Sequence, residues 1–268
     1  MPFDLGRGSL SNESVAFQNK KLFDELVAIV KKAREGNYLE HVGEITTGLS
    51  DAIKRYVNMT TIIGISEDQF ACAIPPLLSR NHALTARFST NEVADGAVGF
   101  NLLEKAKKNI AGVVNNKEGR LYGDFTDIPV IMAFHTSLFK KGSILTPEEV
   151  AAIMLHEVGH GYTYFELLSR VVTTNLVLAA ISKELDKSDS VEDREIILKA
   201  VMKTQDLEGI DPTELSKAKS RRVVDTVVIT AMKRKYEAEL GYDVYDITAC
   251  EQAADNFATR YGAGMHLS

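Results

Sequence analysis

The sequence predicts a mostly helical α+β protein, and three observations lead to this expectation. Apolar residues recur at helical spacing along most of the 268 residues. Strand character is confined to two short runs, the β-branched residues 59–65 and the apolar residues 128–134, which turn signals bound. An H-E-x-x-H pattern at residues 156–160 lies on a segment with a strong helix-start signal. The chain is long enough for one large domain or two small ones.

The composition is that of an ordinary globular protein, with 45% hydrophobic and 25% charged residues. A formal net charge of -6 gives no basic footprint for nucleic acid. The apolar residues 171–181 are fewer than the roughly 20 that a membrane span needs. Cys72 and Cys250 are the only cysteines, and the first residues do not read as a secretory signal. We therefore expect a reducing, cytoplasmic location, with a place in a virion or another assembly left open.

Residues 1–110 are predicted to form a mainly helical region, to which the sequence assigns no role. A first helix is expected to begin at residues 11–12 and to end at Gly36. A second helix, with apolar residues at helical spacing over residues 45–56, could form an antiparallel hairpin with the first. The strand at residues 59–65 follows directly.

The apolar residues 128–134 precede the H-E-x-x-H segment and are expected to form a strand. Pro129 has no backbone N–H, which favours the edge of a sheet. An edge strand can bind an extended peptide by strand addition. An interior strand of a small sheet is an equally good interpretation of the same residues.

The helix that carries the pattern has a capping box at its start. Thr146 is the expected N-cap, Pro147 takes the first helical position and Glu149 completes the box. His156 and His160 are four residues apart, so both imidazoles lie on one helical face and can reach one ion. Glu157 projects beside that ion, where it can take a proton from a metal-bound water.

A catalytic zinc usually has three protein ligands, so two histidines leave one ligand to find. The C-terminal segment, residues 245–261, is predicted to be helical and places Glu251 and Asp255 on one face. Ala254 and Ala258 would let this helix approach the histidine helix closely. Glu251 is then the expected third ligand, and Asp255 the acceptor for the outer ring N–H of a ligand histidine.

Three residues near the C-terminus are further candidates. The oxyanion of a tetrahedral intermediate needs a hydrogen-bond donor. Tyr261, His266 and Arg260 follow the third-ligand helix and are candidates for this role. His266 is also an alternative to Glu251 as the third ligand.

The segments L-T-P-E-E-V-A-A-I-M-L-H-E-V-G-H and E-x-x-A-D resemble the gluzincin metallopeptidases. Within these, they are most similar to the CAAX prenyl protease and its soluble, heat-shock-protease-like relatives. The resemblance covers about residues 128–165 and 247–259. The chain departs from the family in lacking its membrane spans and in separating His160 from Glu251 by 91 positions.

The resemblance implies a zincin-like metallopeptidase domain over residues 111–268, with a charged helical insertion at about residues 183–235. It implies one Zn²⁺ per chain and hydrolysis of peptide bonds in a peptide or protein substrate. The implied site comprises the ligands His156, His160 and Glu251, the general base Glu157 and the orienting carboxylate Asp255. A second hypothesis is a structural or assembly component that retains a metallopeptidase fold with little or no activity.

Overall fold

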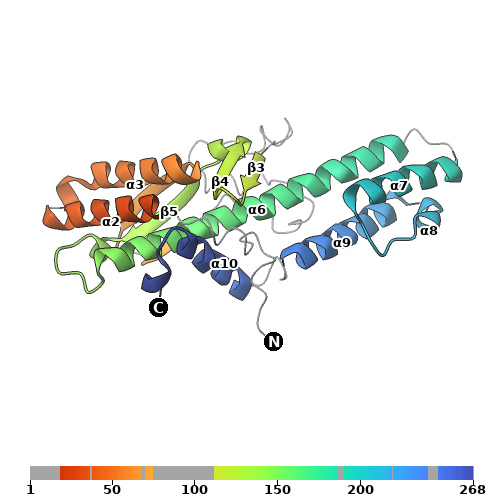
Figure 1. Ribbon diagram of the computed structural model, residues 1–268. Helices are drawn as coiled ribbons and strands as arrows, with labels where there is room; N and C mark the ends of the chain where they lie inside the picture. Colours follow the sequence, from red (N-terminus) through yellow and green to blue (C-terminus); the bar gives the residue numbers. More distant parts are fainter. Residues whose placement is uncertain are drawn as a thin grey trace.

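The computed structural model describes residues 19–36, 38–67, 70–74, 112–185, 190–218, 220–240 and 247–267. Helices dominate this part of the chain, and the strands form two small sheets (Figure 1). The expected α+β class, mostly helical, is confirmed. None of the described helices combines the length and apolar character that crossing a membrane requires.

The first two helices form the predicted hairpin. Helix α2 (Lys20–Glu35) ends at Gly36 as expected, and α3 (Val42–Val57) follows the short η2 (Tyr38–Glu40). Arg55 near the end of α3 pairs with Glu25 near the start of α2 at 2.5 Å, whereas Lys32 pairs with Glu44 at the other end at 3.9 Å. This reversed order of contacts is antiparallel. The expected start at residues 11–12 lies outside the described residues.

A three-stranded sheet has the strand order β1-β5-β2. Strand β1 (Thr61–Ser66) is parallel to β5 (Val130–His135), and β2 (Ala71–Ile74) is antiparallel to β5. The expectation that β5 is an edge strand is therefore wrong, because it lies between the other two. Pro129 precedes the first strand residue, so its missing N–H removes no bond from the ladder. Strand β2, which the sequence did not reveal, pairs with β5 and is at the edge of the sheet among the strands that the structure describes.

The second sheet is a hairpin of β3 (Gly112–Asn115) and β4 (Arg120–Gly123). Gly119 and Gly123 both have φ of 65°, a left-handed conformation that glycine adopts without strain. The 3-10 turns η3 (Asp124–Asp127) and η4 (Thr136–Leu138) flank β5.

Helix α6 (Pro147–Leu185) has 39 residues and begins at the predicted capping box. Thr146 N donates to Glu149 Oε2 at 2.6 Å, and Glu149 N donates back to Thr146 Oγ1 at 3.2 Å. The apolar residues 171–181 lie in the second half of this helix. Residues 162–185 contain no Gly or Pro to interrupt it.

The buried apolar residues form two separate clusters. The first core joins α2, α3, the three-stranded sheet and the first half of α6, with residues from both sides of position 110. The second core joins the far part of α6 to α7 (Val191–Gln205), α8 (Pro212–Ser216) and α9 (Arg221–Leu240), which Figure 1 shows as an arm. Helix α10 (Ile247–Arg260) and η5 (Gly264–His266) return to the first core.

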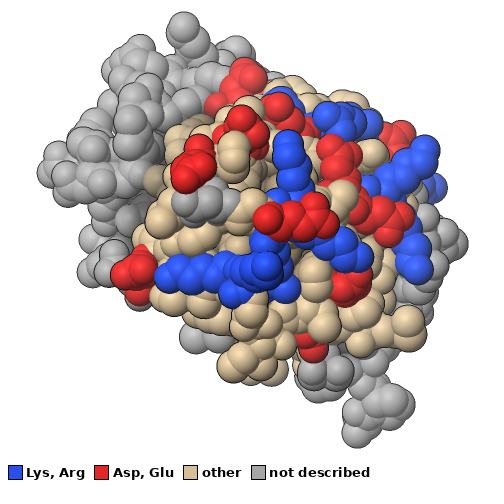
Figure 2. Space-filling view, turned by 90° about the vertical axis from the view of Figure 1, so that its left-hand side faces the viewer, with Lys and Arg blue, Asp and Glu red and all other residues tan. Residues whose placement is uncertain are grey.

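The surface at the α2–α3 end of the molecule carries both signs of charge side by side (Figure 2). Lys31 pairs with Glu148 at 2.7 Å, and Lys140 pairs with Glu67 at 3.6 Å. Basic and acidic side chains therefore alternate over the described part of this face.

Candidate metal centre

The centre is built where α6 and α10 cross at very short range. A Cβ atom added to Gly159 would lie 2.7 Å from Ala254 Cα and 2.8 Å from its carbonyl oxygen. Only glycine fits at this position, and the buried Ala254 and Ala258 keep the facing surface of α10 small. The close approach that the sequence predicted from these alanines is therefore present.

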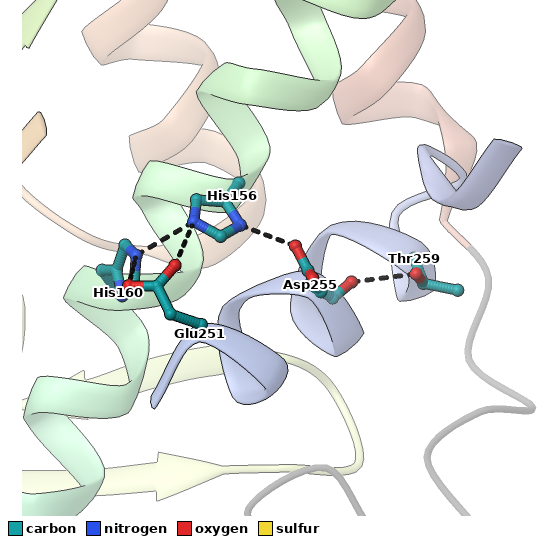
Figure 3. Close-up of polar contacts among 5 residues, drawn as sticks. All are labelled: His156, His160, Glu251, Asp255 and Thr259. Atoms are coloured by element: carbon teal, nitrogen blue, oxygen red, sulfur yellow. Dashed lines mark hydrogen bonds and ion pairs between the residues drawn. The ribbon is translucent and has the colours of Figure 1, made fainter. Parts of the chain in front are cut away.

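Three side chains converge beside the crossing, as Figure 3 shows. His156 Nε2 lies 3.0 Å from His160 Nε2 and 3.2 Å from Glu251 Oε2. His160 Nε2 lies 3.6 Å from Glu251 Oε1. Within the described residues, these three form the one group of histidine, cysteine and acidic side chains close enough to share an ion.

The spacing of these atoms suits a tetrahedral zinc ion. Ligand bonds of about 2.0–2.1 Å at tetrahedral angles put neighbouring ligand atoms roughly 3.3 Å apart. The two histidine nitrogens are 3.0 Å apart, and each lies 3.2 or 3.6 Å from one of the two Glu251 oxygens, which is close to this value. The Glu251 side chain is 53% exposed, so solvent reaches this carboxylate.

Asp255 fixes the orientation of one histidine. Its Oδ1 lies 2.7 Å from His156 Nδ1, where a carboxylate accepts the ring N–H. The proton on Nδ1 leaves the lone pair of Nε2 directed toward His160 and Glu251. Thr259 is one turn further along α10, and its Oγ1 donates a hydrogen bond to the Asp255 backbone carbonyl at 2.8 Å (Figure 3).

The electrostatics of the second histidine also favour a ligand role. Burial, together with the neighbouring His156, lowers the pKa of His160. A lowered pKa favours the neutral imidazole, which is the form that binds a metal.

Glu157 is buried on the side of α6 that faces β2. Burial raises the pKa of its carboxyl group, while His156 and the backbone N–H of Ala73 act in the opposite direction. The hydrogen bond from Ala73 ties this carboxylate to β2. A carboxylate with a raised pKa is better suited to accept a proton near neutral pH than an exposed one.

The structure does not bring the expected oxyanion donors to this group. Tyr261 is buried, and its hydroxyl donates to the Gly119 carbonyl at 3.0 Å. The Arg260 guanidinium donates to the Asn116 carbonyl. His266 stacks on Phe23 with ring centroids 5.4 Å apart.

His266 also fails as an alternative third ligand. It lies near Glu148 and Glu149, which are two turns before His156 on α6. The roles predicted for Tyr261 and His266 do not fit these positions, because α10 directs its last turn at the β3–β4 hairpin and η5 turns back toward α2.

A buried polar cluster behind the metal group was missed by the sequence analysis. Tyr162 OH donates to Asn115 O at 3.1 Å and lies 3.0 Å from Asn116 Oδ1. Glu166 also hydrogen-bonds Asn116, and burial raises the pKa of this carboxyl to about 7. Together with Arg260, these contacts tie α6 and α10 to the turn of the β3–β4 hairpin. A polar turn segment gave no signal that its residues would be buried.

Comparison with protein-family models, with curated proteins and with solved structures finds no match to this chain.

Proposed function

We propose that the chain is a metalloendopeptidase that holds one Zn²⁺ and hydrolyses peptide bonds of a peptide or protein substrate. The observation that carries the proposal is the convergence of His156, His160 and Glu251, with Asp255 on the outer nitrogen of His156. The kinship with gluzincin peptidases and a zincin-like fold for residues 111–268 belong to this proposal.

The residues around the group have distinct roles in this reaction. When bound at such a group, zinc lowers the pKa of a water molecule and polarises a carbonyl. Glu157, whose pKa burial raises, would be the group that accepts a proton from the attacking water and returns it to the leaving amine. Asp255 keeps the Nδ1 proton on His156, so that Nε2 stays available as a ligand.

The peptide is proposed to bind along β2 rather than along β5. Strand β5 has neighbours on both sides, whereas β2 pairs with β5 alone within the described residues. The hydrogen bond from Ala73 to Glu157 places this edge beside the general base. Residues 71–74 belong to the N-terminal region, which therefore contributes to the substrate site.

Zinc content and cleavage test the proposal together. The full-length chain should bind one equivalent of zinc, cleave an unstructured protein such as casein, and lose cleavage on chelation and regain it on adding zinc. Glu157→Gln should keep zinc but lose cleavage by at least ~10²-fold, because the general base is gone. Glu208→Gln, the same change at an exposed arm position, should leave cleavage unchanged.

Two results would contradict the proposal. Cleavage that persists in Glu157→Gln would show that Glu157 is not the general base. Stoichiometric zinc with no cleavage of any peptide library would instead favour the structural or assembly hypothesis.

A further inference from the structure

The register of β2 divides its backbone groups between two directions. His135 N donates to Phe70 O at 2.8 Å, so these two residues form a hydrogen-bonded pair across the antiparallel ladder. Hydrogen-bonded pairs alternate with non-hydrogen-bonded pairs along an antiparallel ladder. The backbone N–H and C=O groups of Cys72 and Ile74 therefore also point toward β5. Ala71 and Ala73 therefore direct their backbone N–H and C=O groups away from β5. The bond from Ala73 N–H to Glu157 agrees with this direction.

The same register sorts the side chains of the sheet between two faces. One face packs on α6 and the first core, and its strand residues include Met132 and Phe134, which are buried. We call the opposite side the open face. Its members are Ile62, Gly64, Ser66, Phe70, Cys72, Ile74, Ile131, Ala133 and His135.

The open face exposes apolar side chains at both edges of the sheet, on and beside β2 and on β1. Phe70 is 55% exposed, Ile74 43% and Ile62 42%. Ile62 and Ile74 both lie opposite Ile131, so three isoleucines form one row across the sheet. In a sheet with one face in water, the side chains on that face are usually polar. Large apolar side chains here point to a ligand that covers them.

We propose that the open face beside β2 selects extended peptide segments with apolar side chains at every second position. The inference deepens the proposed function and rests on it, because the peptide must pass Glu157. A strand added at Ala71 and Ala73 places alternate side chains next to Phe70, Cys72 and Ile74. Its remaining side chains point toward α6 and the metal group.

The dimensions of β2 favour a peptide over a second copy of the chain. The strand has four residues and offers two outward-facing ones, so pairing with an identical edge would bury little surface. A flexible peptide can instead continue past both ends of β2 and bury its apolar side chains on the open face. Ala71 offers both backbone groups to it, and Ala73 offers its carbonyl.

Binding is measured on the full-length chain with a chelator present, so that no peptide is cut. The probe is a labelled octapeptide of alternating Val and Ser, and its comparison peptide has four Val followed by four Ser. We expect the alternating peptide to bind about tenfold more tightly, and Ile74→Ser and Phe70→Ser each to weaken it about fivefold. Val113→Ser, the same change at an exposed position of β3, should have no effect.

Three outcomes of the binding experiment would overturn the inference. One is equal affinity for the two peptides. Another is unchanged binding in both Ile74→Ser and Phe70→Ser. The third is self-association of the chain that Ile74→Ser abolishes, without any binding of the alternating peptide.

Cleavage by the zinc-loaded chain separates this inference from the proposed function. Two alternating octapeptides, one starting with Val and one with Ser, should be cut at the same type of bond, always before Val or always after it. Cleavage at both bond types, with unchanged rates in Ile74→Ser, overturns the inference and leaves the peptidase proposal standing. Selective binding without any cleavage supports the inference and counts against the peptidase proposal.

Discussion

The two halves of α6 place one continuous helix in two different environments. The first half carries His156, Glu157 and His160, and it packs on the sheet, α2 and α10. The second half packs on α7 and α9 in the second core. The first half is thus fixed by elements from both ends of the chain, whereas the arm is assembled from residues close together in sequence. A precise ligand geometry requires the first kind of support.

Charged and polar side chains mark the boundary between the halves. Glu166 hydrogen-bonds the β3–β4 turn, and one turn later the Arg170 guanidinium lies 5.1 Å from the ring centroid of Tyr236 on α9. Arg170 and Arg260 both act on the Glu166 carboxylate. Glu166 thus contacts elements beside the first core, and Arg170 contacts a helix of the second core.

The largest expected effects come from truncating one residue in each core. Phe257→Ala removes a fully buried ring beside the helix crossing and should cost about 3–5 kcal/mol of unfolding free energy. Leu198→Ala in the arm should cost about 2–5 kcal/mol. Only Phe257→Ala should also weaken zinc binding, because its ring lies under the ligand helices. Denaturant unfolding and zinc titration measure the two effects. Equal loss of zinc affinity in both variants would show that the halves act as one unit.

The next effect concerns the pH dependence of stability at the boundary. In the folded chain the pKa of Glu166 is about 7, against 4.5 for an ordinary glutamate. Between these values the unfolded chain releases the proton that the folded chain keeps, so this residue destabilises the fold as pH rises from about 4.5 to 7. The parent chain should therefore lose more unfolding free energy over this pH range than Glu166→Gln does, by about 1–3 kcal/mol.

Unfolding free energies of the parent chain and Glu166→Gln between pH 5 and 7.5 provide the measurement. The difference between the two proteins isolates Glu166 from other titrating groups, including His160. Parallel pH profiles would mean that Glu166 stays ionised in the folded chain.

The smallest expected effect is a single methyl group at the helix crossing. Gly159→Ala would press on the Ala254 backbone, and overpacking of this kind costs about 1–3 kcal/mol. The better helix propensity of alanine offsets ~0.5–1 kcal/mol of this cost. Gly43→Ala on α3 is the matched control, because a Cβ atom there meets nothing within 4 Å.

Thermal unfolding and zinc affinity should separate these glycine variants. Gly159→Ala should lose stability and zinc affinity together, since the crossing sets the distance from His156 and His160 to Glu251. Gly43→Ala should gain slight stability with the same zinc affinity. A Gly159→Ala variant that binds zinc normally would show that the two helices need not approach so closely.

Several features could be read from the sequence because they depend on neighbouring residues. The capping box at Thr146 and the stop at Gly36 are local hydrogen-bonding and conformational effects. The four-residue spacing of His156 and His160 places both on one face wherever the helix packs. The two helices of the N-terminal hairpin follow from their apolar periodicity in the same way.

Other features escaped the sequence because they depend on partners far along the chain. Which strand occupies a sheet edge is decided by pairing between β5 and two distant strands. The four residues of β2 are too few to show a clear period. Asn116 looks like any residue of a polar turn, although its side chain lies 3.0 Å from the hydroxyl of the buried Tyr162 on α6.

The sequence by itself determined the helix and the facing histidines, and it limited their expected partners to a few candidates, Glu251, Asp255 and His266, since residue types at helical spacing limit which side chains can meet. Only the tertiary structure decided that these carboxylates reach the histidines, because 91 positions separate His160 from Glu251. It also decided that β2, among the described strands, is the edge beside Glu157, and that Tyr261 and His266 turn away. Long-range packing fixes such relations, and no local pattern encodes them.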